Sequence, residues 1–172
     1  MQPTIQNIVI TANLSASLDV KNIALHKGKY NERMNIAIIK IDKPKSTALI
    51  FKTGKMVCLG TKNESDAYKA CFEFEKKIGF KTHLTEFRIQ NITASCNLQF
   101  PIDLYKLYGI LPNSVYEPEL FPALTFRLSY PKVTFLIFTS GKIVLTGAKV
   151  EKHIYSAFKF LYPIIKEGRK TI

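Results

Sequence analysis

The sequence predicts an α+β fold in which two similar halves build one antiparallel sheet with helices on one face. The first observation is a repeated segment. Residues 47–62, TALIFKTGKMVCLGTK, return at 134–149 as TFLIFTSGKIVLTGAK, with nine of sixteen positions identical. The second is a shorter repeat near the start of each half, at 5–14 and 89–98. The third is an amphipathic helical pattern after each copy of the longer repeat.

Each half opens with a predicted strand. The segments IQNIVITANL and IQNITASCNL share six of ten positions, and their side chains alternate as in a half-buried strand. One face of the two strands carries polar or small side chains at matched places: Asn7, Val9 and Thr11, and Asn91, Thr93 and Ser95. The opposite face carries Ile8 and Ile10 in the first copy, so it is the face that we expect in the core.

A short helix is expected after each of these strands. In the first half it covers 17–25, with Ser17 or Asp19 able to cap its N-terminus. In the second half it covers 101–107, where Pro101 suits the first turn because a proline N–H is not needed there.

A further strand and a long helix complete each half. The strands are predicted at 35–41 and 124–129. The long helices are predicted at 64–78 and 151–166, where apolar residues recur at helical spacing. Pro163 predicts a kink or an early end of the second long helix.

The repeated sixteen-residue segment reads as a β-hairpin, because Gly54 or Gly141 separates two apolar, β-prone runs. No linker-like sequence separates the halves, which we divide into a first repeat, 1–85, and a second repeat, 86–172. One continuous sheet is therefore expected, and its second face carries no helix.

That uncovered face is the most informative feature of the pattern. A large apolar face without a helix on it is either the core of a sheet sandwich or a binding surface. Alternation collects these residues on it: Asn7, Val9, Leu49, Phe51, Val57, Leu59, Asn91, Thr93, Leu136, Phe138, Val144 and Thr146.

The charge of the chain favours a polyanionic partner. Twenty-five Lys and Arg stand against 13 Asp and Glu, a formal net charge of +12, which fits nucleic acid or an anionic membrane surface. The basic residues lie in predicted strands and turns instead of along one amphipathic helix, which makes membrane binding the weaker alternative.

Other classes of function find little support in the sequence. Cys58, Cys71 and Cys96 are unclustered within apolar runs, so we expect buried thiols, no disulfide and no metal site. No catalytic constellation repeats or clusters, so we expect no enzyme and no cofactor, although an enclosed ligand or a repair enzyme sharing this half-fold is a second class to weigh. Neither a membrane helix nor a signal peptide is seen, and we expect a soluble intracellular protein.

Several motifs together carry a resemblance to a known family. They are the two IQN strands, ALIF…TGKMV and LIF…SGKIVLTGAK, VYEPELFP at 115–122, the Ala24-Leu25-His26 and Tyr30-Asn31 segments, and the YP…K…RK of 162–170. Almost the whole chain resembles the conserved core of the TATA-box-binding protein family.

The resemblance implies a saddle-shaped, pseudo-two-fold fold whose concave sheet lies on the DNA minor groove and whose helices lie on the convex side. The family is a well-known example of minor-groove binding and kinking. It implies a nuclear general transcription initiation factor that binds A·T-rich TATA promoter DNA. The implied partners are factors IIA and IIB, TBP-associated factors and the RNA polymerase machinery, with self-association as a homodimer off DNA left open.

The family's site residues can be carried over position by position. The implied base contacts are Asn7, Val9, Leu49, Val57, Leu59, Asn91, Thr93, Leu136, Val144 and Thr146. The implied DNA wedges are Met34, Phe51, Phe121 and Phe138. The implied phosphate contacts are Arg33, Lys40, Lys55, Lys62, Arg127, Lys142 and Lys149. Glu117, Glu119 and Leu120 lie in the loop that the family offers to factor IIB. No residues are assigned to factor IIA, which docks on the first half in the family.

The chain departs from the family at a few of these places. Met34 stands where the family has a wedging phenylalanine, Asn35 where it has a small residue, Leu59 where it has a threonine and Thr93 where it has a valine. These departures keep open a related paralogue with a different promoter preference.

Overall fold

The computed structural model describes residues 1–79 and 81–170. The strands are β1 (Thr4–Asn13), β2 (Lys29–Asn31), β3 (Ile36–Asp42), β4 (Lys45–Phe51), β5 (Lys55–Thr61), β6 (Thr85–Asn97), β7 (Ala123–Leu128), β8 (Val133–Phe138) and β9 (Lys142–Ala148). The helices are α1 (Val20–Lys27), α2 (Glu64–Ile78), α3 (Leu104–Ile110) and α4 (Glu151–Glu167). The α+β class is therefore confirmed.

The chain folds into two compact units. The first unit is Gln6–Asn91, and the second unit is Ile92–Ile172 together with Met1–Ile5. Strands follow the order β2-β3-β4-β5-β1 in the first unit and β6-β9-β8-β7 in the second, and their hairpin partners are antiparallel. Strands β1 and β6 each contribute residues to both units.

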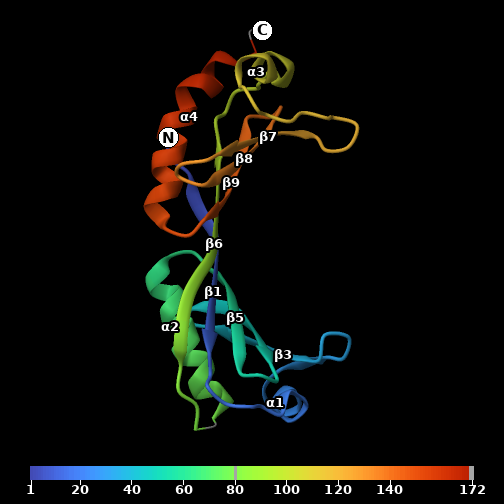
Figure 1. Cartoon of the computed structure of the whole chain (residues 1–172), viewed down its shortest axis with the longest axis vertical. Coiled ribbons are helices and arrows are strands. Elements are labelled where there is room, and N and C mark those ends of the chain that lie inside the picture. Colours follow the sequence, from blue (N-terminus) through green and yellow to red (C-terminus); the bar gives the residue numbers. More distant parts are fainter. Residues whose placement is uncertain (80, 171–172) are drawn as a thin grey trace. The chain divides into compact units, whose positions relative to one another are not determined.

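A long helix covers one face of the strands in each unit. Figure 1 shows α2 along one side of the first unit's strands and α4 along one side of the second unit's strands. Each helix buries the apolar stripe expected from its spacing: Ala67, Cys71, Phe74 and Ile78 on α2, and Ile154, Ala157, Phe158, Leu161 and Ile165 on α4. Helix α2 also buries Ala70, which the spacing did not single out. The predicted amphipathic helices are confirmed.

The two faces of each strand differ in burial as the alternation predicts. In β4, Ala48 and Ile50 are fully buried, whereas the neighbouring Leu49 is half-buried. In β8, Phe135 and Ile137 are fully buried between half-buried neighbours. Each unit therefore has a closed face under its long helix and a half-exposed face, which we call the open face.

The short helices begin later than predicted. The first runs over Val20–Lys27, because Asp19 caps it by accepting a hydrogen bond from the Asn22 N–H at 3.1 Å. The second runs over Leu104–Ile110, where Asp103 accepts from the Lys106 N–H at 3.0 Å. A first-turn position for Pro101 was therefore wrong, since the aspartate two residues later supplies the capping acceptor.

The early end of the second long helix was also wrong. The helix α4 continues through Pro163 to Glu167, and the exposed Pro163 lies on its solvent side. Tyr162 and Ile165 on either side keep the helix packed, and the missing proline N–H removes a single backbone hydrogen bond. Tertiary burial of the apolar stripe outweighs the local propensity of proline.

The three cysteines are buried free thiols, as predicted. A hydrogen bond joins the Sγ atoms of Cys58 and Cys71 at 3.6 Å, and this contact together with burial raises the pKa of Cys58 above its ordinary value. Burial raises the pKa of Cys96 to about 11. All three side chains pack as small apolar groups.

The turn glycines of the repeated hairpins are required by a close approach of backbone. The φ angles of Gly54 and Gly141 are +91° and +86°. An added Cβ would lie 2.4 Å from the Ala16 carbonyl oxygen at Gly54, and 2.2 Å from that of Phe100 at Gly141. Their own carbonyls accept from the N–H groups of Leu14 and Leu98. The duplicated glycine therefore locks each hairpin to the segment that follows the opening strand.

We expect Gly141→Ala to lower the free energy of unfolding far more than Gly147→Ala. Both glycines have positive φ, which costs an alanine about 1 kcal/mol, but a Cβ at Gly147 has no atom within 4 Å. At Gly141 the clash adds about 1–3 kcal/mol. Urea unfolding of the two variants measures the difference, and equal losses would show that the close approach is unimportant.

Candidate nucleic-acid interface

Strand register lines up side chains in rows across the open face of the first unit. The first row crosses four strands and joins Ile38, Leu49, Val57 and Thr11. A second row joins Lys40, Thr47 and Leu59, and Val9 lies on the neighbouring strand β1 where the register shifts between Ile8 and Ile10. The face is therefore largely apolar, with a cation at its edge.

The second unit repeats both rows. Its first row joins Thr125, Leu136, Val144 and Ser95. Its second row joins Arg127, Thr134 and Thr146, and Thr93 lies opposite Thr146 where the register shifts between Ile92 and Ala94. The ten residues predicted as base contacts are all half-buried, neither sealed in the core nor fully solvated. Their role toward DNA stays a prediction.

Four residues of the first rows were not among the predicted contacts, namely Thr11, Ile38, Ser95 and Thr125. Ile38 lies directly across from the predicted contact Leu49, and Thr125 lies directly across from Leu136. The alternation could not single out Ile38, because the run IAIIKI in β3 is apolar on both faces. The hairpin register would have found it, since β3 and β4 pair residue for residue.

Asn7 is fixed by a backbone contact at the register shift of β1. The Gly60 N–H donates to Asn7 Oδ1 at 2.7 Å. A backbone N–H requires an acceptor, so the oxygen of the amide faces Gly60 and its N–H₂ group is directed elsewhere. Asn91, the matched residue of the second repeat, is likewise half-buried and takes part in an interaction within the protein.

The predicted wedge residues occupy matched places in the two units. Phe51 pairs with Ile36, two residues after Met34, and Phe138 pairs with Ala123, two residues after Phe121. The rings of Phe121 and Phe138 meet edge to face, with centroids 6.3 Å apart. Met34 is 55% exposed and Phe121 is 45% exposed. The second unit thus presents an assembled aromatic pair, where the first presents one ring and a flexible thioether.

The turn that carries Met34 explains the neighbouring asparagine. Asn35 has φ of +53°, a left-handed conformation that asparagine tolerates better than most side chains. Its Oδ1 accepts from the Tyr30 hydroxyl at 2.6 Å, and Asn31 Oδ1 accepts from the Met34 N–H at 3.0 Å. These hydrogen bonds stabilise the turn. They explain why an asparagine occupies position 35, which the resemblance to the family alone did not.

All seven predicted phosphate contacts are exposed. Three pairs are matched between the units: Lys40 with Arg127, Lys55 with Lys142, and Lys62 with Lys149. The members of the first pair border the second rows, and those of the other pairs lie at the two ends of β5 and β9. Arg33 lies on the turn before β3. Each open face therefore has a basic border.

The segment before β7 extends away from the helix side of the second unit, as Figure 1 shows in gold. Glu117, Glu119 and Leu120 are exposed there, and Leu120 is 80% exposed. The N–H groups of Leu120 and Phe121 both donate to the Glu117 carbonyl at 2.9 Å. This tight turn holds the acidic side chains and the leucine at the surface.

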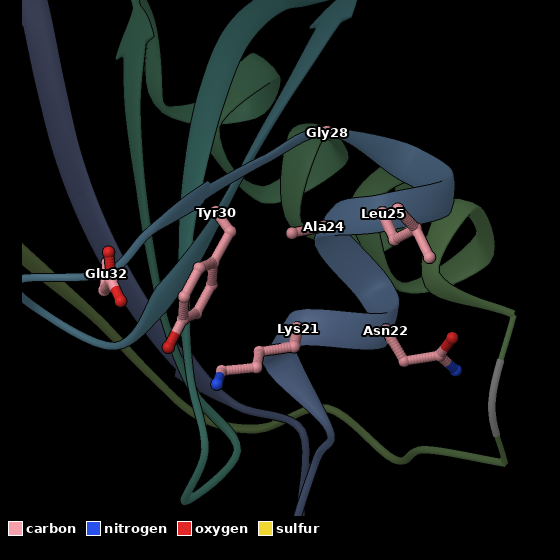
Figure 2. Close-up of a pocket in the computed structure, with 7 residues that line it drawn as sticks. All are labelled: Lys21, Asn22, Ala24, Leu25, Gly28, Tyr30 and Glu32. Carbon is pink, nitrogen blue, oxygen red and sulfur yellow. The ribbon is translucent and has the colours of Figure 1, made fainter.

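A separate pocket of about 800 Å³ lies in the first unit between α1 and the edge strand β2. Figure 2 shows Lys21 directed toward the Tyr30 ring, with the Lys21 Nζ 5.6 Å from the ring centroid. The remaining lining residues are Asn22, Ala24, Leu25, Gly28 and Glu32. None of these residues is a predicted DNA contact, so the pocket is distinct from the open face.

Two other kinds of site were searched for among residues 1–79 and 81–170. No group of three or more His, Cys, Asp or Glu there could hold a metal ion. Within the same residues, no helix combines the length and the apolar character needed to cross a membrane.

Comparisons with known proteins agree on one family. The model described as "Transcription factor TFIID (or TATA-binding protein, TBP)" matches residues 2–79 and 86–168. The Schizosaccharomyces pombe TATA-box-binding protein is 53% identical over 175 residues, covering 98% of this chain and 76% of that protein. The Saccharomyces cerevisiae protein of the same name is 49% identical over 175 residues, covering 98% of this chain and 73% of that protein. The structure of Methanococcus jannaschii TBP matches with a TM-score of 0.81 at 32% identity, covering 98% of this chain and 100% of that chain.

Proposed function

The chain belongs to the TATA-binding protein family, and on that premise we propose that it is a general transcription initiation factor that binds TATA promoter DNA in the minor groove. The observation that carries the proposal is the half-buried open face of both units, which has an apolar pair at its centre (Leu49 and Val57, or Leu136 and Val144) and matched cations at its border. As a member of this family it is a DNA-binding factor and not an enzyme.

The chemistry of the open face suits an A·T-rich minor groove. In that groove, A·T and T·A pairs both present acceptors on a smooth floor, whereas G·C pairs add the protruding guanine amino group. Leu49, Val57, Leu136 and Val144 offer apolar contact and no hydrogen-bonding group. Asn7 can donate from its amide while Gly60 holds the oxygen. Such a surface favours A·T pairs without distinguishing A·T from T·A.

In this proposal, the wedge residues bend the DNA. Inserting an apolar side chain between base pairs costs a few kcal/mol per step, which the larger contact area of bent DNA offsets. Phe121 and Phe138 already meet edge to face in the second unit, so little reorganisation is needed there. Met34 and Phe51 take the same role in the first unit, with a methionine that must lose more rotational freedom.

The partners and location are proposals that rest on the family. Glu117, Glu119 and Leu120 form an exposed surface for factor IIB, and factor IIA binds the first unit. TBP-associated factors and the RNA polymerase machinery assemble on the bound complex in the nucleus.

A paralogue with another promoter preference is not favoured. The similar proteins at about half identity over 98% of this chain are themselves named TATA-box-binding proteins. The departures at Met34 and Leu59 therefore act as adjustments within TATA binding.

We expect DNA affinity to fall steeply with salt. If all seven exposed cations neutralise phosphates, log K falls with log salt at a slope of about −6. Lys142→Ala should reduce that slope by about one unit and leave the preference for A·T-rich over G·C-rich duplex unchanged. Lys152→Ala, with the same loss of charge on α4, is the control. A collapse of sequence preference in Lys142→Ala would exclude a backbone contact.

We expect Glu119→Arg to abolish recruitment of factor IIB to the DNA complex, because it reverses a charge on the exposed loop. Gel-shift titration measures IIB recruitment and DNA affinity on the same duplex. Glu167→Arg makes the same charge reversal at the end of α4 and should recruit IIB normally. Loss of DNA binding together with IIB binding would indicate a misfolded loop instead of a lost contact.

We expect Met34→Phe to slow dissociation and to deepen the kink made by the first unit, since a rigid ring stacks on the exposed base. Fluorescent base analogues at each kink step of one oriented site report unstacking. The reciprocal change Phe121→Met should make the other kink shallower. Equal unstacking at both steps in the wild type would contradict the assigned difference.

A further inference from the structure

The two open faces differ in hydrogen-bonding chemistry at one pair of matched positions. In the second unit, Thr93 and Thr146 face each other across β6 and β9, and their hydroxyl oxygens lie 3.1 Å apart. In the first unit, the same positions of β1 and β5 hold Val9 and Leu59. All four side chains are half-buried, so each pair is accessible from the open face.

The surroundings of the two pairs are otherwise alike. Leu59 lies across from Thr47, which lies across from Lys40. Thr146 lies across from Thr134, which lies across from Arg127. A threonine and an exposed cation therefore flank both pairs in the same order. Along this row, the loss or gain of a hydroxyl is confined to the pair itself.

The threonine pair can accept a hydrogen bond where the Val9–Leu59 pair cannot. Two hydroxyls carry two hydrogens and four lone pairs, and the bond that joins them uses one of each. Hydroxyl groups rotate and exchange partners when a ligand binds, so this pair can accept from a donor on DNA in exchange for a bond made within the protein. Val9 and Leu59 present only methyl groups.

This difference bears on the one donor of the minor-groove floor. The guanine amino group is absent from A·T pairs. When the guanine amino group faces a hydroxyl, it exchanges its hydrogen bond to water for one to the protein. When it faces methyl groups, it loses the bond to water and gains none, so binding of that base pair is disfavoured. A guanine is therefore tolerated differently by the two units.

We propose that these four residues make the two halves of the DNA site unequal, so that a single G·C pair sets the direction in which the protein lies. The second unit binds the half of the DNA site that contains the guanine, which then lies over Thr93 and Thr146. The first unit binds the half that contains only A·T pairs, which lies over Val9 and Leu59. The inference rests on the proposed minor-groove binding and adds a direction to it.

The first measurement is an affinity scan with one G·C pair placed at each position of a symmetric A·T-rich duplex. Orientation is read with a DNA-cleaving iron chelate attached to the added thiol of the variant Thr139→Cys. Thr139 is exposed in the second unit, and the native thiols are buried and shielded from labelling. We expect one guanine position at which cleavage moves to the guanine half with a bias of about tenfold, the lower range for one mismatched pair.

Replacing that guanine by inosine removes the amino group alone and should abolish the bias. The double variant Thr93→Val with Thr146→Leu copies the first unit and should lose the bias. The converse variant Val9→Thr with Leu59→Thr should tolerate guanine in either half. A cooperative urea unfolding transition close to that of the wild type shows in each case that the variant is folded, and the bias is compared between duplexes bound by the same variant.

Equal cleavage of both halves at every guanine position, with A·T preference intact, would overturn the directional inference and leave the proposed function standing. The same would follow from a bias that survives inosine. Failure of the wild type to prefer A·T-rich over G·C-rich duplex would instead overturn the proposed function itself.

Discussion

The structure depends on covering each unit's strands with a long helix on one face only. The stripes of α2 and α4 bury one set of alternating side chains completely, and the period of two in a strand then forces the other set outward. Leu49, Val57, Leu136 and Val144 are apolar and half-buried for this reason. An exposed apolar surface promotes aggregation when no partner covers it. Here it is complementary to a DNA groove whose floor is smooth.

Because the sequence is repeated, the same local interactions occur in both units. The positions at which the two copies differ are therefore informative. The turn glycines, the register shifts and the basic borders recur at matched positions. The pairs at Val9 with Leu59 and at Thr93 with Thr146 do not match, and neither do Met34 and Phe121. Because these side chains lie on or beside the open face, they alter what is bound without altering how the unit folds.

Much of the fold could be predicted from the sequence, because its signals were strong and repeated. The long helices follow from an apolar stripe of helical period, and the hairpins follow from two matched glycine turns. The short helices were placed too early, since Asp103 competed with Pro101 as a start signal and capping geometry decided between them. Ile38 was missed because its strand is apolar on both faces, and only the register across β3 and β4 identifies its row. The left-handed Asn35 depends on Tyr30, a contact that no spacing rule would reveal.

The most direct test of minor-groove recognition is binding to a duplex in which every A·T pair of the site is replaced by an I·C pair. An I·C pair presents nearly the same minor groove as A·T, because inosine lacks the guanine amino group, but a different major groove. If the open faces of the two units read the minor groove, affinity and bending should be kept within a few-fold of the A·T duplex and lost on the matching G·C duplex. Loss of binding on the I·C duplex as complete as on the G·C duplex would contradict the account.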